Sequence, residues 1–490
     1  MQIQELRVPK SKRTIPFLLN QKIISSGLLC DSPIIFIGGR VERTMSIYAV
    51  DPEYSVSALN SSVPPSIMPS MAQRPIAGTS SSLVSIVSQS STQQAGGLIQ
   101  VNIPNQPNTY IKSGSCFLKM LVTITSTGAN TGAASALTGG CASGNWSSLL
   151  LRATMSAGPN VLEQINQYAQ YDSLLNLHAG SAGYFQGNMK ELYGQSITIG
   201  ATDASASTYS FTVCIPLNFG LLNSSEELHF PLGLLNAGVQ MAFDLQGDLN
   251  QAIYKPAAIT GVTSYTYSCS NISVNYESIK VPVEHFMSLR QQMASDGSLY
   301  QIPYVSALNM SIGAQATTDQ TLGVGLSSLK GVFSTLCPAS AFGTQYVSNR
   351  YGLTQWRALL DGQMINQFSL PQINSGTANS EVEFYVELQR ALGVLGSVVR
   401  TAGPSSFTPA SIAALNGTAQ TTSPYYANYF WTGLGCNKFS EHGLTYTGSS
   451  VSQLQVHGET ISGTAVTMYI VLIYDSCLFI NSQGDCSVNR

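Results

Sequence analysis

Histidines are the first residues to test for chemistry, because imidazole can bind a metal or carry a proton near neutral pH. The chain has five, at His178, His229, His285, His442 and His457. Four of them have an acidic neighbour in sequence, at Glu227, Glu284, Glu441 and Glu459. No second histidine follows any of the five at the spacing that zinc ligands share. Structural or surface histidines are therefore favoured, and we expect no metal ligand.

Patterns for nucleophilic and phosphate chemistry are absent from the sequence. It has no Gly-x-Ser-x-Gly elbow, no glycine-rich phosphate loop with its lysine, and no zinc-protease helix. The Glu226-Glu227 pair could act as general acid and base, but it lies in a polar turn, where solvated charges are expected. The sequence thus predicts no catalytic, cofactor-binding or metal residue, no small-molecule substrate and no enzyme activity.

The cysteines and sequons give no stronger signal. The nine cysteines are scattered, at Cys30, Cys116, Cys141, Cys214, Cys269, Cys337, Cys436, Cys477 and Cys486. An odd number without a Cys-x-x-Cys pair fits free thiols in a reducing compartment. Six sequons occur, at Asn60, Asn145, Asn223, Asn271, Asn309 and Asn416. We interpret them as chance matches, because the chain is rich in Ser and Thr.

Composition limits the class of protein. Of 490 residues, 44% are hydrophobic and only 10% are charged, against about 25% charged in a typical soluble chain. The net charge of −3 gives no global field that would attract nucleic acid or an anionic membrane. The longest apolar run, residues 468–474, is too short to span a bilayer, and we find no convincing signal peptide. Such a surface must be polar and uncharged, or must be covered by neighbours.

The elements that position any site are mainly strands. In residues 211–245, Phe211, Val213 and Ile215 alternate with polar or small residues, and Val239 to Leu245 do the same. Pro216, Gly220 and Pro231 break the stretch between them, which favours a corner connection over a tight hairpin. The pattern predicts two strands joined across the end of a barrel or sandwich.

The same reasoning covers the rest of the chain after residue 97. Strands are expected at residues 99–103, 110–125, 146–157, 264–280, 298–303, 308–312, 326–338, 429–439, 443–456 and 468–480. A hairpin is expected at Asp361-Gly362, with strands at residues 351–360 and 364–368. Helices are expected at residues 161–178, 283–292 and 380–392. Loops are expected at residues 128–144, 184–207 and 396–427.

Residues 1–95 differ from the rest. Residues 55–94 are rich in Ser, Pro, Gln and Gly, which is typical of a linker or extended arm. The basic cluster of Lys10, Lys12 and Arg13 could touch nucleic acid or act as a localisation signal. A solvated terminus is the favoured interpretation, since such clusters are common in tails.

The order of these landmarks resembles that of double jelly-roll major capsid proteins of tailless icosahedral dsDNA viruses, of the virophage, polinton-like or adintovirus type. The most specific match is a strand with S-L-L-x-R, a glycine turn and V-L-E-x-I-x-x-Y. It is carried by Ser148, Leu149, Leu150, Arg152, Val161, Leu162, Glu163, Ile165 and Tyr168. Residues 326–338, 380–392 and 429–439 resemble later landmarks of the family. One departure is Cys116, where the family pattern has Ser.

The resemblance implies a fold and a function. The expected fold class is all-β, with two tandem eight-stranded antiparallel jelly rolls, a few short helices and long loops. The expected domains are an arm at residues 1–95, a first jelly roll at residues 96–282 and a second at residues 283–490. The expected function is a major capsid protein whose pseudo-hexameric homotrimers tile an icosahedral shell around a DNA genome.

The same resemblance implies the partners and the location. The chain would contact itself, neighbouring capsomers, penton and minor capsid proteins, and the arm would contact membrane or DNA at the inner face. It would be made in the host cytoplasm and reside in the virion. Two alternatives stay open: a minor capsid or spike protein, and a secreted carbohydrate-binding β-sandwich protein. The second would need a secretory signal, paired cysteines, and carboxylates or aromatic residues clustered in a groove.

Overall fold

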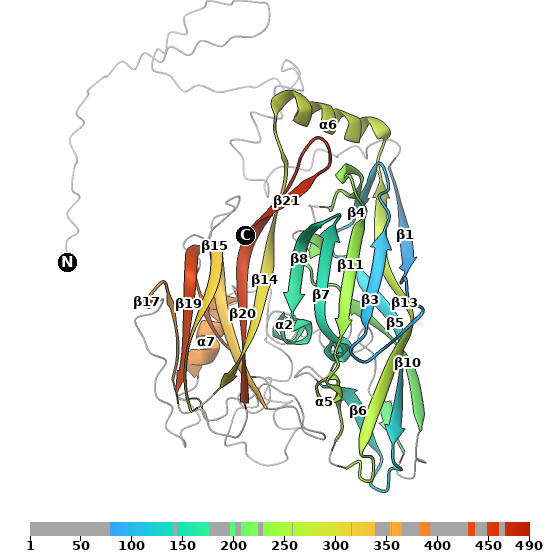
Figure 1. Cartoon of the computed structure of the whole chain (residues 1–490), viewed down its shortest axis with the longest axis vertical. Coiled ribbons are helices and arrows are strands. Elements are labelled where there is room, and N and C mark those ends of the chain that lie inside the picture. The colour runs from blue at the N-terminus through green and yellow to red at the C-terminus, as the bar shows by residue number, and fades with distance from the viewer. Residues whose placement is uncertain are drawn as a thin grey trace, which may run out of the picture. The chain divides into compact units, whose positions relative to one another are not determined.

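Antiparallel β-sheets make up most of the part of the chain that the computed structural model describes (Figure 1). The structure describes residues 79–140, 145–175, 197–200, 207–223, 229–256, 258–314, 316–338, 353, 355–364, 382–392, 430–436, 448–459 and 466–490. These residues belong to one compact unit, Arg74–Arg490. The basic cluster at residues 10–13 and the loop expected at residues 396–427 lie outside the described residues.

Two sheets pack face to face in the N-terminal half, which we define as residues 80–280. The first sheet has the order β1-β13-β5-β10 with two short strands beside β13. Its strands are β1 (Ser80–Val87), β2 (Thr92–Gln94), β4 (Thr109–Ile111), β5 (Phe117–Thr127), β10 (Thr208–Pro216) and β13 (Ser264–Lys280). The second sheet has the order β3-β11-β7-β8. Its strands are β3 (Leu98–Ile103), β7 (Leu150–Ala157), β8 (Asn160–Asn166) and β11 (Val239–Leu245).

The stretch at residues 211–245 crosses from one sheet to the other, as its pattern predicts. Strand β10 lies in the first sheet and β11 in the second. Val213 and Ile215 on β10, and Met241 and Phe243 on β11, are all 0% exposed. Side chains alternate along a strand, so each strand turns its apolar face into the space between the two sheets.

A small third sheet corrects the loop expected at residues 128–144. It has the order β12-β6-β9 and contains β6 (Ser135–Gly139), β9 (Ile197–Ile199) and β12 (Ile253–Tyr254). Leu137 on β6 is fully buried. Gly139 and Gly140 lie where a Cβ would come within 2.0 Å of a backbone carbonyl oxygen, so their small size allows the close packing. Low-complexity composition therefore concealed a strand.

The helix expected at residues 161–178 is wrong in its first part. Residues Asn160–Asn166 form strand β8, which pairs with β7 around Gly158. A helix, α2, begins only at Tyr168 and ends at Leu174. Between them Gln167 has a positive φ of 48°, a left-handed conformation that separates strand from helix. Residues 176–178 lie outside the described residues.

Residues 80–94 also differ from the expected linker. Strand β1 pairs antiparallel with β13, from Ser80 opposite Lys280 to Val87 opposite Ser273, and β2 pairs with the middle of β13. Backbone hydrogen bonds hold this Ser-rich strand, with Val84 and Ile86 half-buried against the core. The domain boundaries near residues 95 and 282 stay predictions.

One sheet dominates the described residues of the C-terminal half, residues 300–490. Its order is β14-β20-β15-β19-β16-β17, with β18 beside β15 and β21 beside β20. The strands are β14 (Tyr300–Ala314), β15 (Thr317–Pro338), β16 (Gln355–Leu360), β17 (Gln363–Met364), β18 (Thr432–Gly435), β19 (Ser449–Glu459), β20 (Val466–Ile480) and β21 (Cys486–Asn489). The hairpin at Asp361-Gly362 is confirmed, with both residues at positive φ. Strands β14 and β15 are longer than expected.

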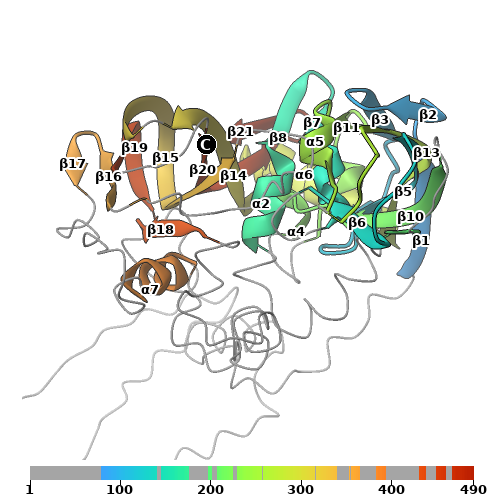
Figure 2. The same ribbon diagram turned by 90° about the horizontal axis from the view of Figure 1, so that it is seen from below.

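Among the described residues, helices are few and mostly short. The two longest are α6 (Val283–Asp296), which links the halves, and α7 (Val382–Ala391), which packs beside β18 (Figure 2). The others are η1 (Trp146–Leu149), α2 (Tyr168–Leu174), α4 (Gly220–Asn223), η4 (Leu232–Leu234) and α5 (Leu249–Ala252). None of the helices among the described residues has the length and apolar character needed to cross a membrane.

The expected all-β class is confirmed. One cluster of buried hydrophobic residues extends through both halves, from Ile99 to Cys486. The two halves therefore share a continuous core.

Candidate functional site: the seam between the two halves

The two halves meet where the edge of one sheet faces the edge of another. Strand β8 ends the sheet β3-β11-β7-β8, and β14 begins the large sheet of the C-terminal half. The two strands lie side by side in Figures 1 and 2. We call this contact zone, formed by β8 and α4 on one side and β14 on the other, the seam.

Side chains from β14 satisfy backbone groups of β8 across the seam. The hydroxyl of Tyr304 donates to the carbonyl oxygen of Leu162 at 3.0 Å. The amide nitrogen Nδ2 of Asn309 donates to the carbonyl oxygen of Asn166 at 2.5 Å. An open strand edge presents unpaired carbonyl groups that must find donors when buried. Here side chains of the other half supply those donors, and the two sheets stay separate.

Glu163 lies at the centre of the seam. Its side chain comes from β8, and the residue is only 2% exposed. Oxygen Oε1 accepts hydrogen bonds from the backbone N–H of Gly220 at 2.9 Å and from the hydroxyl of Ser306 at 2.7 Å. Oxygen Oε2 accepts from the backbone N–H of Leu221 at 3.1 Å. One carboxyl group thus joins β8, α4 and β14.

The electrostatics of Glu163 reflect two opposed effects. Burial raises the pKa of Glu163 to about 7, because the charged form loses its hydration. The hydrogen bonds from Gly220, Ser306 and Leu221, and the positive charge of Arg490, act in the opposite direction. Burial also raises the pKa of Tyr304, and the neighbouring Glu163 adds to that shift.

A glycine allows the close approach of α4 to β14. A Cβ on Gly220 would lie 1.9 Å from the carbonyl oxygen of Val305, closer than real Cβ atoms come to any such atom. A side chain here would force the two backbones apart. The seam therefore depends on the absence of a side chain at residue 220.

A buried network holds the segment that carries Gly220. The hydroxyl of Tyr168 donates to the carbonyl oxygen of Pro216 at 2.8 Å and accepts from the backbone N–H of Asn218 at 2.9 Å. The carboxylate of Asp172, which is fully buried, accepts from Nδ2 of Asn218 at 2.7 Å and from Nδ2 of Asn145 at 3.1 Å. These contacts fix the path of the chain from β10 into α4.

A second contact joins the halves near α6. The guanidinium of Arg290 on α6 donates to the carbonyl oxygens of Gly233 and Leu234, at 3.1 and 3.3 Å. The turn between β20 and β21 reaches the same loop, where the backbone N–H of Asn236 donates to the carbonyl oxygen of Gly484 at 2.9 Å. Gly484 has a φ of 88°, a conformation that favours glycine. The halves are thus joined at more than one place.

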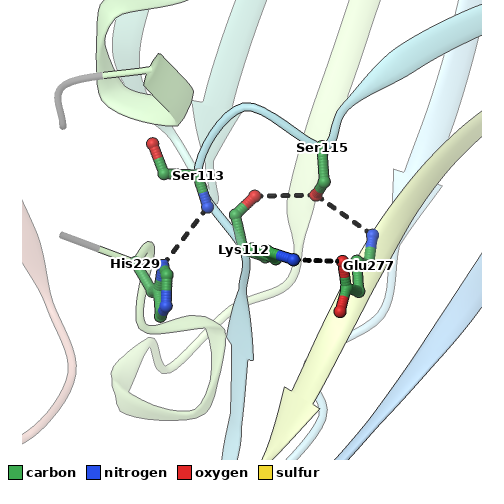
Figure 3. A network of polar contacts seen from close by, with 5 residues as sticks. All are labelled: Lys112, Ser113, Ser115, His229 and Glu277. Atoms are coloured by element: carbon green, nitrogen blue, oxygen red, sulfur yellow. Dashed lines mark hydrogen bonds and ion pairs between the residues drawn. The ribbon is translucent and has the colours of Figure 1, made fainter. Parts of the chain in front are cut away.

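A polar network around His229 brings together a histidine, a lysine, a glutamate and two serines (Figure 3). Ser115 donates from its hydroxyl to the carbonyl oxygen of Lys112 and accepts from the backbone N–H of Glu277. Lys112 pairs with Glu277 at 2.7 Å. Nδ1 of His229 accepts from the backbone N–H of Ser113 at 3.3 Å, so this ring nitrogen is bonded to a backbone amide and not to a hydroxyl. The network closes the turn between β4 and β5 onto β13.

Electrostatics agree with a structural role for this network. The pKa of His229 is lowered, first by burial and then by the nearby charge of Lys112. The hydrogen bond from Lys112 lowers the pKa of Glu277. A neutral imidazole beside a lysine-carboxylate pair is a stable arrangement near neutral pH.

The remaining described histidines also have structural partners. Nε2 of His285 lies 2.9 Å from the hydroxyl of Tyr110. Nε2 of His457 lies 2.8 Å from Glu459 and its Nδ1 lies 3.8 Å from Asp319. The two ring nitrogens of His457 face different carboxylates, so one ion cannot contact all three groups. Within the described ranges no group of His, Cys, Asp and Glu is placed to hold a metal.

The remaining histidines, the paired glutamates, the cysteines and the sequon asparagines singled out in the sequence have no catalytic arrangement among the described residues. His178, His442, Glu226, Glu227, Cys30, Cys141, Asn60 and Asn416 lie outside the described residues. The seven described cysteines are free thiols, as their spacing predicts. Asn145 and Asn309 are buried and donate hydrogen bonds, while Asn223 and Asn271 are exposed. The asparagines of two of the six sequons are therefore buried residues that donate hydrogen bonds inside the protein.

Together these features define a class of protein. Two β-rich halves, joined edge to edge in one chain through a linker helix and a shared core, form a double jelly roll.

Comparison with known proteins supports that fold. The chain is similar to a chain of the Sputnik virophage, with a TM-score of 0.52 and 12% identity over 84% of this chain and 88% of that chain. It is similar to a chain of the PBCV-1 virus capsid, with a TM-score of 0.50 and 13% identity over 84% and 97% of the two chains. It is also similar to PBCV-1 VP54, fitted into a reconstruction of the virophage Sputnik, with a TM-score of 0.50, 11% identity and coverage of 84% and 97%.

These likenesses establish the fold. No protein-family model and no curated protein matches the chain. The matched chains are covered over most of their length, so the similarity extends over both halves.

In the sequence, Glu163 stands out only as one position of the V-L-E-x-I-x-x-Y motif, and the motif assigns it no structural role. Its partners Gly220 and Ser306 lie 57 and 143 residues away in sequence. The one local signal is an acidic residue between two apolar positions, Leu162 and Ile165. A buried acid of this kind is often functional or at a contact between elements.

Proposed function

We propose that the chain is a viral major capsid protein that assembles as pseudo-hexameric homotrimers and tiles an icosahedral shell around a DNA genome. The observation that carries the proposal is the seam, which holds two jelly rolls edge to edge as one body. Three such chains would present six similar sandwiches around one axis, and that arrangement approximates sixfold symmetry. The fold similarity to the PBCV-1 capsid chain and the Sputnik virophage chain supports the proposal.

The surface supports a protein that is covered by its own copies. Only 10% of the residues are charged. Strand β1 lies at an edge of its sheet, has no charged residue, and exposes Leu83 and Val87 by 71% and 69%. Soluble proteins usually protect such an edge with charges or proline. Permanent contacts between copies bury roughly 2,000 Å² or more and would cover surfaces of this kind.

The proposal extends to partners, location and chemistry. The chain would contact neighbouring capsomers, penton and minor capsid proteins within the virion, after synthesis in the host cytoplasm. The residues that precede β1 would reach the inner face of the shell and contact membrane or DNA there. The chain would serve a structural role without enzyme activity, a small-molecule substrate or a cofactor.

Electron microscopy of the purified full-length chain tests the proposed function. We expect uniform particles with a near-hexagonal outline and a threefold axis. Isolated two-lobed particles at micromolar concentration would contradict the proposal. Counting copies in an intact virion would separate a major capsid protein from a minor capsid or spike protein.

A further inference from the structure

The seam contains a charge-bearing group that contacts both halves. Glu163 is buried, and its carboxyl oxygens accept hydrogen bonds from α4 of the N-terminal half and from Ser306 of the C-terminal half. Opening the seam would break the contact with Ser306 and expose the carboxyl group to water. The protonation state of Glu163 and the closure of the seam are therefore linked.

We infer that Glu163 is a proton-controlled latch between the two jelly rolls: the protonated form holds the seam closed, and ionisation favours its opening. The inference adds regulation to the proposed function and depends on it only for its consequence in assembled particles. The latch itself is a property of the isolated chain and can be tested there.

Geometry gives each protonation state a hydrogen-bonding arrangement. In the ionised form, the Ser306 hydroxyl donates to Oε1 at 2.7 Å, and the backbone N–H groups of Gly220 and Leu221 donate to Oε1 and Oε2. In the protonated form, the hydroxyl of Ser306 can instead accept the proton on Oε1 at the same distance. Ser306 also bonds the hydroxyl of Tyr474, so its own donor retains a partner.

The groups around Glu163 set the direction of the effect. Arg490 is the positive charge acting on the carboxyl group and favours the ionised form. The hydroxyls of Tyr171, Tyr304 and Tyr474 are neutral at physiological pH, and burial moves the pKa of each further above its ordinary value. Asp172 acts on Tyr171 from the neighbouring helix. Burial outweighs the charge of Arg490 and raises the pKa of Glu163 to about 7.

The direction of the pH effect follows from the linkage between proton binding at Glu163 and opening of the seam. Once the seam is open, Glu163 regains water and its pKa returns toward 4.5, below the value in the closed seam. The closed seam binds the proton more tightly, so opening becomes easier as pH rises between about 4.5 and 7. With these two values the opening equilibrium increases about tenfold between about pH 6 and about pH 8.5. The closed seam is therefore more stable at mildly acidic pH than at mildly alkaline pH.

Hydrogen exchange of the full-length chain tests the latch. The reporter is the peptide spanning residues 217–223, because α4 packs against β14 and opening of the seam exposes the amides of Gly220 and Leu221 to water. After correction for the intrinsic exchange rate, its protection should fall about tenfold between about pH 6 and about pH 8.5 in the wild type. In Glu163→Gln, which keeps the shape but cannot ionise, protection should stay constant over that range. The matched control Glu284→Gln, an exposed acid on α6, should behave as the wild type.

A second variant keeps the test decisive if Glu163→Gln does not fold. Ser306→Ala retains the carboxyl group and removes a hydrogen bond that lowers its pKa. The fall in protection should then move to higher pH. Equal pH dependence in wild type and Glu163→Gln would overturn the latch, as would protection that increases with pH. Either result would leave the trimer and the proposed function intact, because those are judged by assembly.

Discussion

Replacing Gly220 with alanine tests whether the two halves are locked by close backbone packing. The added Cβ would lie 1.9 Å from the carbonyl oxygen of Val305, and real Cβ atoms essentially never approach within 3.0 Å. The backbones of α4 and β14 must therefore separate by about 1 Å, and overpacking of this kind costs about 1–3 kcal/mol. The shift also weakens the hydrogen bonds to Glu163, and each such bond contributes about 0.5–1.5 kcal/mol. We expect Gly220→Ala to lower the free energy of unfolding by about 3 kcal/mol.

Denaturant-induced unfolding followed by tryptophan fluorescence measures this loss. Trp146 in the N-terminal half and Trp356 and Trp431 in the C-terminal half are all buried, so both halves contribute to the signal. The matched control is Gly313→Ala on β14, where a Cβ would meet nothing within 4 Å. That variant should unfold as the wild type does, or be slightly more stable. Equal stability of Gly220→Ala and Gly313→Ala would refute the tight seam.

Two further predictions concern single hydrogen bonds. Tyr304→Phe should lower the free energy of unfolding by about 1–2 kcal/mol, because the carbonyl of Leu162 loses its donor across the seam. Tyr276→Phe is the control: among the described residues its hydroxyl has no partner, and equal losses in both variants would argue against the contact. Asp361→Ala should cost about 1 kcal/mol in the same assay, because the carboxylate of Asp361, in the β16–β17 turn, accepts from the backbone N–H of Ser452 on β19. An unchanged unfolding midpoint would contradict that role.

The sequence predicts strands best where one face of a strand is buried and the other is not. Residues 264–280 alternate in this way, and β13 has the predicted bounds. The Asp361-Gly362 hairpin was predictable for another local reason, since both residues tolerate positive φ. In these places the information lies within a few neighbouring residues.

The errors arose where distant residues decide the structure. In residues 161–166 the apolar positions fit a helix, because Leu162 and Ile165 are three apart. Strand β8 forms because β7 pairs with it, and because Glu163 finds its partners in α4 and β14. A buried acid also disturbs the alternation that marks a strand.

Local composition predicted a loop or linker in two further segments that form strands. Apart from Leu137, residues 135–139 are small or polar, yet they form β6, with Leu137 buried and Gly139 placed where a neighbouring backbone approaches closely. Residues 80–87 are half serine, yet β1 forms through the backbone ladder to β13. Neither ladder pairing nor close backbone packing can be predicted from the local composition alone.

The proposed self-assembly is tested most directly by the native mass of the purified full-length chain. One chain has a mass of 52.2 kDa. Native mass spectrometry at micromolar concentration should give a dominant species at three times that mass, about 157 kDa. A dominant species at the mass of a single chain would contradict the proposed capsid role.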